Sequence, residues 1–206
     1  WGGLYLDVPH DAGSAAARRW ILSEASRRPS EGEPPTGAIY SDLGYLIAGE
    51  VIARVAGDKL DKVVARYLTD PLGVSRDLYY PASLAPDRRA QVVREAAPTE
   101  YCEWRGRLIR GEVHDENCAA FGGVAGNSGM FGTARGVAIL GRACLDSLLG
   151  RSDFLPRPLI EQAVAPRPDG SSMRLGWDGK SPKDSSAGRR MGDRAFGHLG
   201  FTGTSI

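Results

Sequence analysis

Two short segments, far apart in the chain, carry side chains that could take part in catalysis. The first is Tyr40-Ser41-Asp42, which precedes an apolar stretch with helical spacing. The second spans residues 198–205 and reads His-Leu-Gly-Phe-Thr-Gly-Thr-Ser. A tyrosine can act as a general base, but a phenol with a pKa of about 10 needs nearby cations to lower it at neutral pH. A histidine is mostly neutral near pH 7 and can exchange hydrogen bonds with a substrate.

Each segment also has a purely structural interpretation. Tyr40 can pack against its surroundings while Ser41 or Asp42 caps the helix that follows. A single histidine in a strand often serves only local hydrogen bonds. Neither segment establishes a function by itself.

The motifs taken together resemble the penicillin-recognising serine hydrolases, the serine β-lactamase-like family. Residues 40–46, then Gly49-Glu50 and residues 71–73, are similar to the region in which that family places a tyrosine general base. Residues 198–205 resemble the strand beside the family's oxyanion site, where Lys-Thr-Gly is the commoner form. These motifs occur in the order that the family has.

The middle of the chain extends the resemblance. Residues 99–117 and the glycine-rich residues 122–134 are similar to a loop signature of one subgroup of these hydrolases. In this stretch His114, Asp115 and Glu116 allow a metal or acid/base interpretation. Three consecutive polar residues point in different directions, however, so helix capping and loop hydrogen bonds explain them at least as well. No lysine follows the glycines at the spacing of a phosphate-binding loop.

The family's third signature, Ser-x-x-Lys, is absent. The four lysines are preceded three positions earlier by alanine, lysine, tryptophan and lysine, never by serine: Lys59, Lys62, Lys180 and Lys183. The resemblance therefore implies a hydrolase fragment whose nucleophilic serine lies outside this chain. We expect no acyl-enzyme from the chain alone.

The resemblance implies Tyr40 as catalytic base, and substrate-binding roles for Asp42, His198, Gly200 and Phe201, with an oxyanion N–H donor near Phe201. Asp42 stands where the family often has asparagine, and an ionised carboxylate accepts hydrogen bonds but donates none. Leu199 replaces a threonine, which removes one substrate-binding hydroxyl. These departures favour an esterase or D-amino-acid peptidase over a β-lactamase.

The implied function is thus hydrolysis of an ester, amide or β-lactam carbonyl through an acyl-enzyme, with a small-molecule or peptide acyl substrate and no cofactor. Two alternatives remain open. One is a relative without catalytic activity that binds peptidoglycan peptides or a partner protein. The other is an inactive truncated remnant.

The expected fold is α+β: part of a β-lactamase/transpeptidase-like fold, with an antiparallel sheet flanked by helices plus a helical region, truncated at both ends. We expect one incomplete domain over residues 1–206, with residues 1–165 mainly helices and loops and residues 166–206 beginning the sheet. Hydrophobic spacing predicts helices over residues 14–27, 41–56, 58–68, 133–149 and 158–165. Strands are predicted over residues 91–93, 173–177 and 194–206, and a loop over residues 98–117.

The helix at residues 41–56 is apolar nearly all round, which predicts burial within the domain unless truncation removes its covering layer. The last strand is predicted to leave an edge unpaired.

Composition excludes several other classes. The chain has 26 basic and 25 acidic residues, so no nucleic-acid partner is indicated. No apolar run reaches the roughly 18 residues of a membrane span. Three separated cysteines and three histidines suggest neither a disulfide framework nor a metal site. The chain begins at Trp1, so the missing signal peptide carries no information on export.

Overall fold

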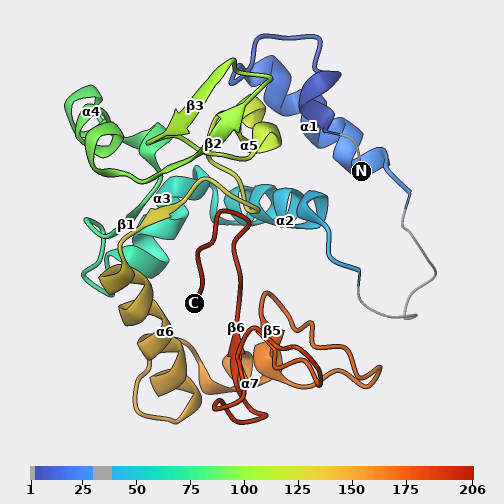
Figure 1. Ribbon diagram of the computed structural model, residues 1–206, viewed down its shortest axis with the longest axis vertical. Helices are drawn as coiled ribbons and strands as arrows, with labels where there is room; N and C mark the ends of the chain where they lie inside the picture. The colour runs from blue at the N-terminus through green and yellow to red at the C-terminus, as the bar shows by residue number, and fades with distance from the viewer. Residues whose placement is uncertain (1–2, 30–38) are drawn as a thin grey trace. The chain divides into compact units, whose positions relative to one another are not determined.

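The computed structural model describes residues 3–29 and 39–206, which form two compact units (Figure 1). The first unit contains the described residues 3–29 and 41–136, and the second contains residues 39–40 and 137–206. Helices and small antiparallel sheets occur in both, so the predicted α+β class is confirmed. The expectation of a single domain stays a prediction.

The first unit contains helices and two small sheets. Its elements, in chain order, are η1 Leu4–Leu6, α1 Ala15–Arg27, α2 Asp42–Ala56, α3 Leu60–Val64, the π-helical η2 Ala65–Thr69, β1 Leu78–Tyr79, η3 Pro81–Ser83, α4 Pro86–Glu95, β2 Pro98–Cys102, β3 Arg107–Arg110, α5 Glu116–Phe121 and β4 Phe131–Gly132. Strand β1 pairs with β4, and β2 pairs with β3, both antiparallel. The helix α6 Ala134–Leu148 begins here and continues into the second unit.

The core of the first unit lies where η1, α1, α2 and α5 meet. Ile21 from α1, Leu46 from α2 and Phe121 from α5 are buried there. Ser14 caps α1 by accepting a hydrogen bond from the Ala17 N–H at 3.1 Å, as predicted. An ion pair also joins two of these helices, because Arg18 of α1 donates to Glu50 of α2 at 2.8 Å.

Helix α2 is less buried than its composition predicts. Leu46, Gly49 and Ala53 face the core, but Val51, Ile52 and Val55 are exposed, Val55 by 84%. The prediction that this helix is buried all round is therefore wrong. The alternative expectation, that part of the helix lacks a covering layer, agrees with the exposed valines and isoleucine. Gly57 ends the helix in the left-handed region, with φ of 66°.

Two predictions for the middle of the chain are wrong. Residues 91–93 belong to the helix α4, which has proline at its start and buries only Val92, rather than to a strand. The predicted loop at residues 98–117 contains the β2–β3 hairpin and the start of α5. Arg105 stabilises the hairpin turn, since its buried guanidinium donates to the carbonyls of Val113, at 2.7 Å, and His114.

The second unit has short elements: the rest of α6, α7 Arg157–Val164, β5 Asp178–Gly179 and β6 Phe196–Gly197. The two helices confirm the predicted ones. The predicted strand at residues 194–206 is wrong over most of its length, because β6 pairs with β5 and the chain then turns back on itself. His198 and Ile206 exchange backbone hydrogen bonds of 3.2 and 3.1 Å, so this end of the chain is paired internally.

Candidate active site

Tyr40 lies immediately before α2. Ser41 occupies the N-cap position with extended backbone, φ −147° and ψ 119°, but its side chain forms no capping hydrogen bond. Asp42 is the first residue of the helix, where a negative charge interacts favourably with the helix dipole. Tyr40 and Asp42 are both exposed, and the predicted side-chain cap is wrong for Ser41.

His198 lies close to Tyr40 within the second unit. The centroids of the two rings are 6.1 Å apart, with the planes tilted by 45°. The Nδ1 atom of His198 is 2.8 Å from the backbone carbonyl of Leu199. A carbonyl only accepts, so a hydrogen bond at this contact has Nδ1 as its donor. The structure thus brings together two residues that are far apart in the sequence.

Gly200 and Phe201 belong to a tight turn that follows His198. The Gly200 N–H donates to the carbonyl of Thr204 at 2.8 Å, so this N–H is used within the turn. A Cβ added at Gly200 would lie 2.1 Å from the Thr204 hydroxyl oxygen, so Gly200 and the Thr204 side chain lie close together in this turn. Phe201 is 89% exposed at the tip of the turn. The proposed oxyanion role of the segment stays a prediction.

Asp42 belongs to the first unit, where it lies in the electrostatic range of a second carboxylate. Burial raises the pKa of Asp115, and the charges of Asp42 and Glu116 raise it further. Hydrogen bonds from the Cys118 N–H and the Asn127 amide act in the opposite direction without cancelling this rise. The first turn of α2 therefore faces a region of negative charge.

The glycine-rich segment packs directly against α2. A Cβ on Gly126 would lie 2.1 Å from the Tyr45 carbonyl, and one on Gly49 would lie 2.7 Å from the Gly126 nitrogen. Only glycine at both positions allows this approach of loop and helix. The glycines are visible in the sequence, but their packing role is not, because their partner lies in a distant helix.

His114, Asp115 and Glu116 serve separate local contacts. The His114 ring lies between Thr99 Oγ1, at 2.9 Å, and Glu100 Oε1, at 3.0 Å. Asp115 caps α5 by accepting from the Cys118 N–H at 2.6 Å. The capping interpretation is thus confirmed for Asp115. Within the described residues, no three His, Cys, Asp or Glu side chains are grouped to hold a metal ion.

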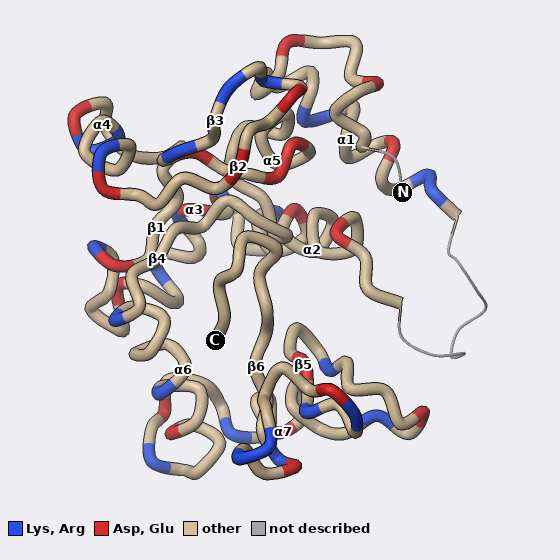
Figure 2. The backbone as a smooth tube through the Cα atoms, viewed as in Figure 1, with Lys and Arg blue, Asp and Glu red and all other residues tan. Residues whose placement is uncertain are grey.

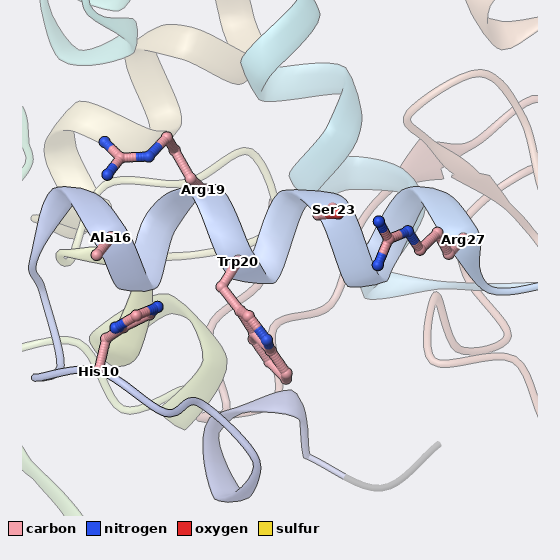
Figure 3. A pocket seen from close by; sticks show the side chains of 6 residues that line it. All are labelled: His10, Ala16, Arg19, Trp20, Ser23 and Arg27. Atoms are coloured by element: carbon pink, nitrogen blue, oxygen red, sulfur yellow. The ribbon is translucent and has the colours of Figure 1, made fainter.

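A separate open groove of about 430 Å³ runs along α1, lined by His10, Ala16, Arg19, Trp20, Ser23 and Arg27 (Figure 3). The Arg19 and Trp20 side chains leave the helix in different directions. Arg27 already pairs with Glu24 at 3.1 Å. The arginine side chains that line the groove therefore do not converge on a common binding position.

Charge gives little further indication of a partner. Figure 2 shows acidic and basic residues interspersed along the described chain rather than separated by sign. None of the helices built from described residues is long and apolar enough to cross a membrane.

Comparison with known proteins identifies relatives of this chain. The profile of the Beta-lactamase family matches residues 2–206. An N-acetylmuramyl-L-alanine amidase of Bacillus subtilis is 27% identical over 218 residues, which cover 98% of this chain and 48% of that protein. A putative D-alanyl-D-alanine carboxypeptidase of Escherichia coli is 25% identical, over 89% of this chain and 44% of the other. The chain thus spans about half the length of these relatives.

Solved structures agree in fold. The D-amino acid amidase of Ochrobactrum anthropi, complexed with D-phenylalanine, superposes with a TM-score of 0.59 at 17% identity, covering 85% of this chain and 49% of the amidase. An octameric penicillin-binding protein homologue from Pyrococcus abyssi gives a TM-score of 0.53 at 15% identity, covering 82% and 37% of the two chains. The chain therefore has the fold of about half of these proteins.

Proposed function

Because this chain belongs to the Beta-lactamase family, we propose that it supplies the general base and part of the substrate site of a serine hydrolase. The observation that carries the proposal is the proximity of Tyr40 and His198, whose ring centroids are 6.1 Å apart. The nucleophilic serine belongs to a Ser-x-x-Lys segment that these 206 residues do not contain.

In the proposed reaction the serine oxygen attacks the substrate carbonyl while the Tyr40 oxygen accepts the serine proton. The tetrahedral intermediate then collapses, and Tyr40 returns the proton to the departing amine or alcohol. Water hydrolyses the acyl-enzyme with the same tyrosine as base. Tyr40 requires a nearby cation for this role, which the lysine of Ser-x-x-Lys would supply. Backbone N–H groups near Phe201 and at the serine would stabilise the oxyanion.

The substrate class follows from the side chains beside these groups. His198 stands where the family commonly has lysine, and Asp42 carries a carboxylate in place of a neutral amide. Both differ from a site that binds a substrate carboxylate through a lysine. We therefore propose an ester or a D-amino-acid amide or peptide in preference to a β-lactam, and the name of the carboxypeptidase relative agrees with a D-amino-acid peptide.

The test begins with the DNA that flanks this segment in its source. The proposal requires an in-frame Ser-x-x-Lys upstream and labelling of that serine by a fluorophosphonate in the whole protein. Tyr40→Phe should then slow acylation by about 10²–10⁴-fold. The exposed Tyr67 provides a matched control, Tyr67→Phe, which should not change the rate.

Two results would contradict the proposal. One is a flanking sequence without the serine, which would favour the binding-protein or remnant alternatives. The other is an unchanged acylation rate in the Tyr40→Phe protein. The present chain by itself should not react with a fluorophosphonate or a penicillin at any residue, which intact-mass spectrometry checks.

A further inference from the structure

A cavity of about 160 Å³ lies between the helical segment α3–η2 and the chain from β1 to η3, and all of its lining residues belong to the first unit. Strand β1 contacts η2 there, and the π-helical turn of η2 supplies part of the wall. Single π-helical turns often occur at functional sites. The exposed residues Ser75 and Ser83 are among those that line the cavity, so it is open to solvent.

Two opposite charges line this cavity. Asp61 and Lys62 are adjacent residues of α3. Neither side chain forms a hydrogen bond or an ion pair with another residue in the described part of the chain. Adjacent positions of a helix do not face each other, which explains why the two groups do not pair together. A ligand that carries both charges would supply a partner for each.

The charge of Asp61 is felt by one of the aromatic side chains in the wall. Burial, followed by the charges of Cys118 and Asp61, raises the pKa of Tyr80 to about 12. Tyr80 is therefore neutral at pH 7, and its hydroxyl lies 3.5 Å from the Ala125 carbonyl. Asp61 is the only carboxylate among the residues that line the cavity.

The remaining wall limits the size and the polarity of a ligand. Val64 and Leu84 give it an apolar side. Two turns along the helical segment from Asp61, the Ser75 hydroxyl lies 3.4 Å from Thr69 Oγ1 and donates to the carboxylate of the neighbouring Asp70 at 2.5 Å. A cavity of about 150 Å³ holds one benzene molecule, so there is room for about six non-hydrogen atoms.

We propose that this cavity binds a small zwitterionic α-amino acid of about the size of alanine. The ammonium group of the ligand pairs with the Asp61 carboxylate, its carboxylate pairs with the Lys62 ammonium group, and its methyl group contacts the apolar side. The site goes beyond the hydrolase function proposed above and shares no residue with it.

The test titrates the chain with D-alanine, L-alanine and two analogues that each lack one charge. Alaninamide has no carboxylate, and N-acetylalanine has no ammonium group. At least one enantiomer of alanine should bind, with NMR shifts at residues 61–65 and 78–84. Each analogue should bind about fivefold more weakly than that enantiomer, the size of one partly exposed ion pair.

Two variants assign each charge of the ligand to its partner. Asp61→Asn should weaken the binding of alanine and remove its advantage over N-acetylalanine. Lys62→Gln should remove its advantage over alaninamide, because a double-mutant cycle isolates the interaction of the two altered groups. The matched controls are Asp87→Asn and Lys59→Gln, which alter exposed charges that do not line the cavity. They should leave all the affinities unchanged.

Three results would overturn the site. They are the absence of binding by both enantiomers, an analogue that binds as tightly as alanine, and the same discrimination in the cavity variants as in the parent chain. Failure of the hydrolase proposal is a separate result, seen as missing acylation of the whole protein. It leaves the amino-acid site standing, and acylation without alanine binding has the opposite meaning.

Discussion

The two units of this chain differ in how they are held together. Nearly all of the buried apolar side chains among the described residues lie in the first unit, where α1, α2 and α5 share a core. In the second unit the described buried apolar residues are Cys144 and Ile160, and the strands are two residues long. Burial of apolar area drives folding, so we expect the first unit to be the more stable one.

The second unit relies instead on local hydrogen bonds. Turns at residues 185–188 and 200–203 close through backbone bonds, and the Ser147 hydroxyl accepts from the Leu155 N–H at 3.1 Å. Each such bond contributes little net stability. The tyrosine–histidine pair therefore lies in the unit with few buried apolar residues, while Asp42 and Asp115 lie in the unit with the larger core.

The largest expected effect on stability comes from truncating a buried side chain in the core of the first unit. Ile21→Ala should lower the free energy of unfolding of the first unit by about 2–5 kcal/mol, because Ile21 is fully buried and a cavity remains. Ile160→Ala should instead affect hydrogen exchange only within residues 137–206. Urea unfolding and exchange measured per residue check both results. Loss of protection throughout the chain in the Ile160 variant would show that the two units unfold together.

The contact between α2 and the glycine-rich loop gives the next largest effect. Gly126→Ala should destabilise the first unit by about 1–3 kcal/mol, because its Cβ would overlap the Tyr45 carbonyl. Gly44→Ala on the same helix meets no atom within 4 Å and should be stabilising by up to about 1 kcal/mol. Thermal unfolding of the two variants should therefore shift in opposite directions, and shifts of the same sign would contradict the packing.

Helix capping predicts a smaller change in the first unit. Ser14→Ala removes the side-chain oxygen that accepts from the Ala17 N–H, and should cost about 1 kcal/mol. The exposed Ser26 at the other end of the same helix is the control, and Ser26→Ala should change stability by less than about 0.5 kcal/mol. Equal effects in urea titrations would mean that Ser14 does not act as the cap.

The smallest expected effect concerns pH. Burial raises the pKa of Glu50, but hydrogen bonds from Arg54 and Arg18 outweigh it, so the net pKa lies below the ordinary value of 4.5. A depressed carboxyl pKa contributes stability above the unfolded value of 4.5 that is lost as the pH falls through the folded value. Glu50→Gln should therefore flatten the acid limb of the stability profile below pH 4.5.

Asp115 in the same unit should behave in the opposite way. Its raised pKa means that the folded state binds the proton more tightly than the unfolded chain, so this group favours folding at low pH and loses that contribution as the pH rises. Asp115→Asn should steepen the acid limb, and urea titrations between about pH 3 and pH 6 compare the two variants. If the free energy of unfolding of both variants changed with pH in the same way, the opposite pKa shifts of Glu50 and Asp115 would be contradicted.

The helices were the most predictable part of the fold. The apolar spacing of α1 and α6, and the glycine that ends α2, are local signals that need no partner. The strand prediction for residues 91–93 was wrong. Two adjacent valines favour a strand locally, whereas in the structure they belong to a helix that buries only Val92 on one face. The β2–β3 hairpin was missed because polar and charged residues occupy most of its positions, which hides the alternation typical of strands.

The sequence by itself determined the motifs, their order and the absence of Ser-x-x-Lys, because these depend only on residue types and spacing. It also determined the helices, since local periodicity and capping specify them. Only the tertiary structure decided that Tyr40 lies near His198, that Gly126 packs on Gly49 and that one face of α2 is exposed. Each of these depends on contacts between segments distant in the chain, which a local pattern cannot encode.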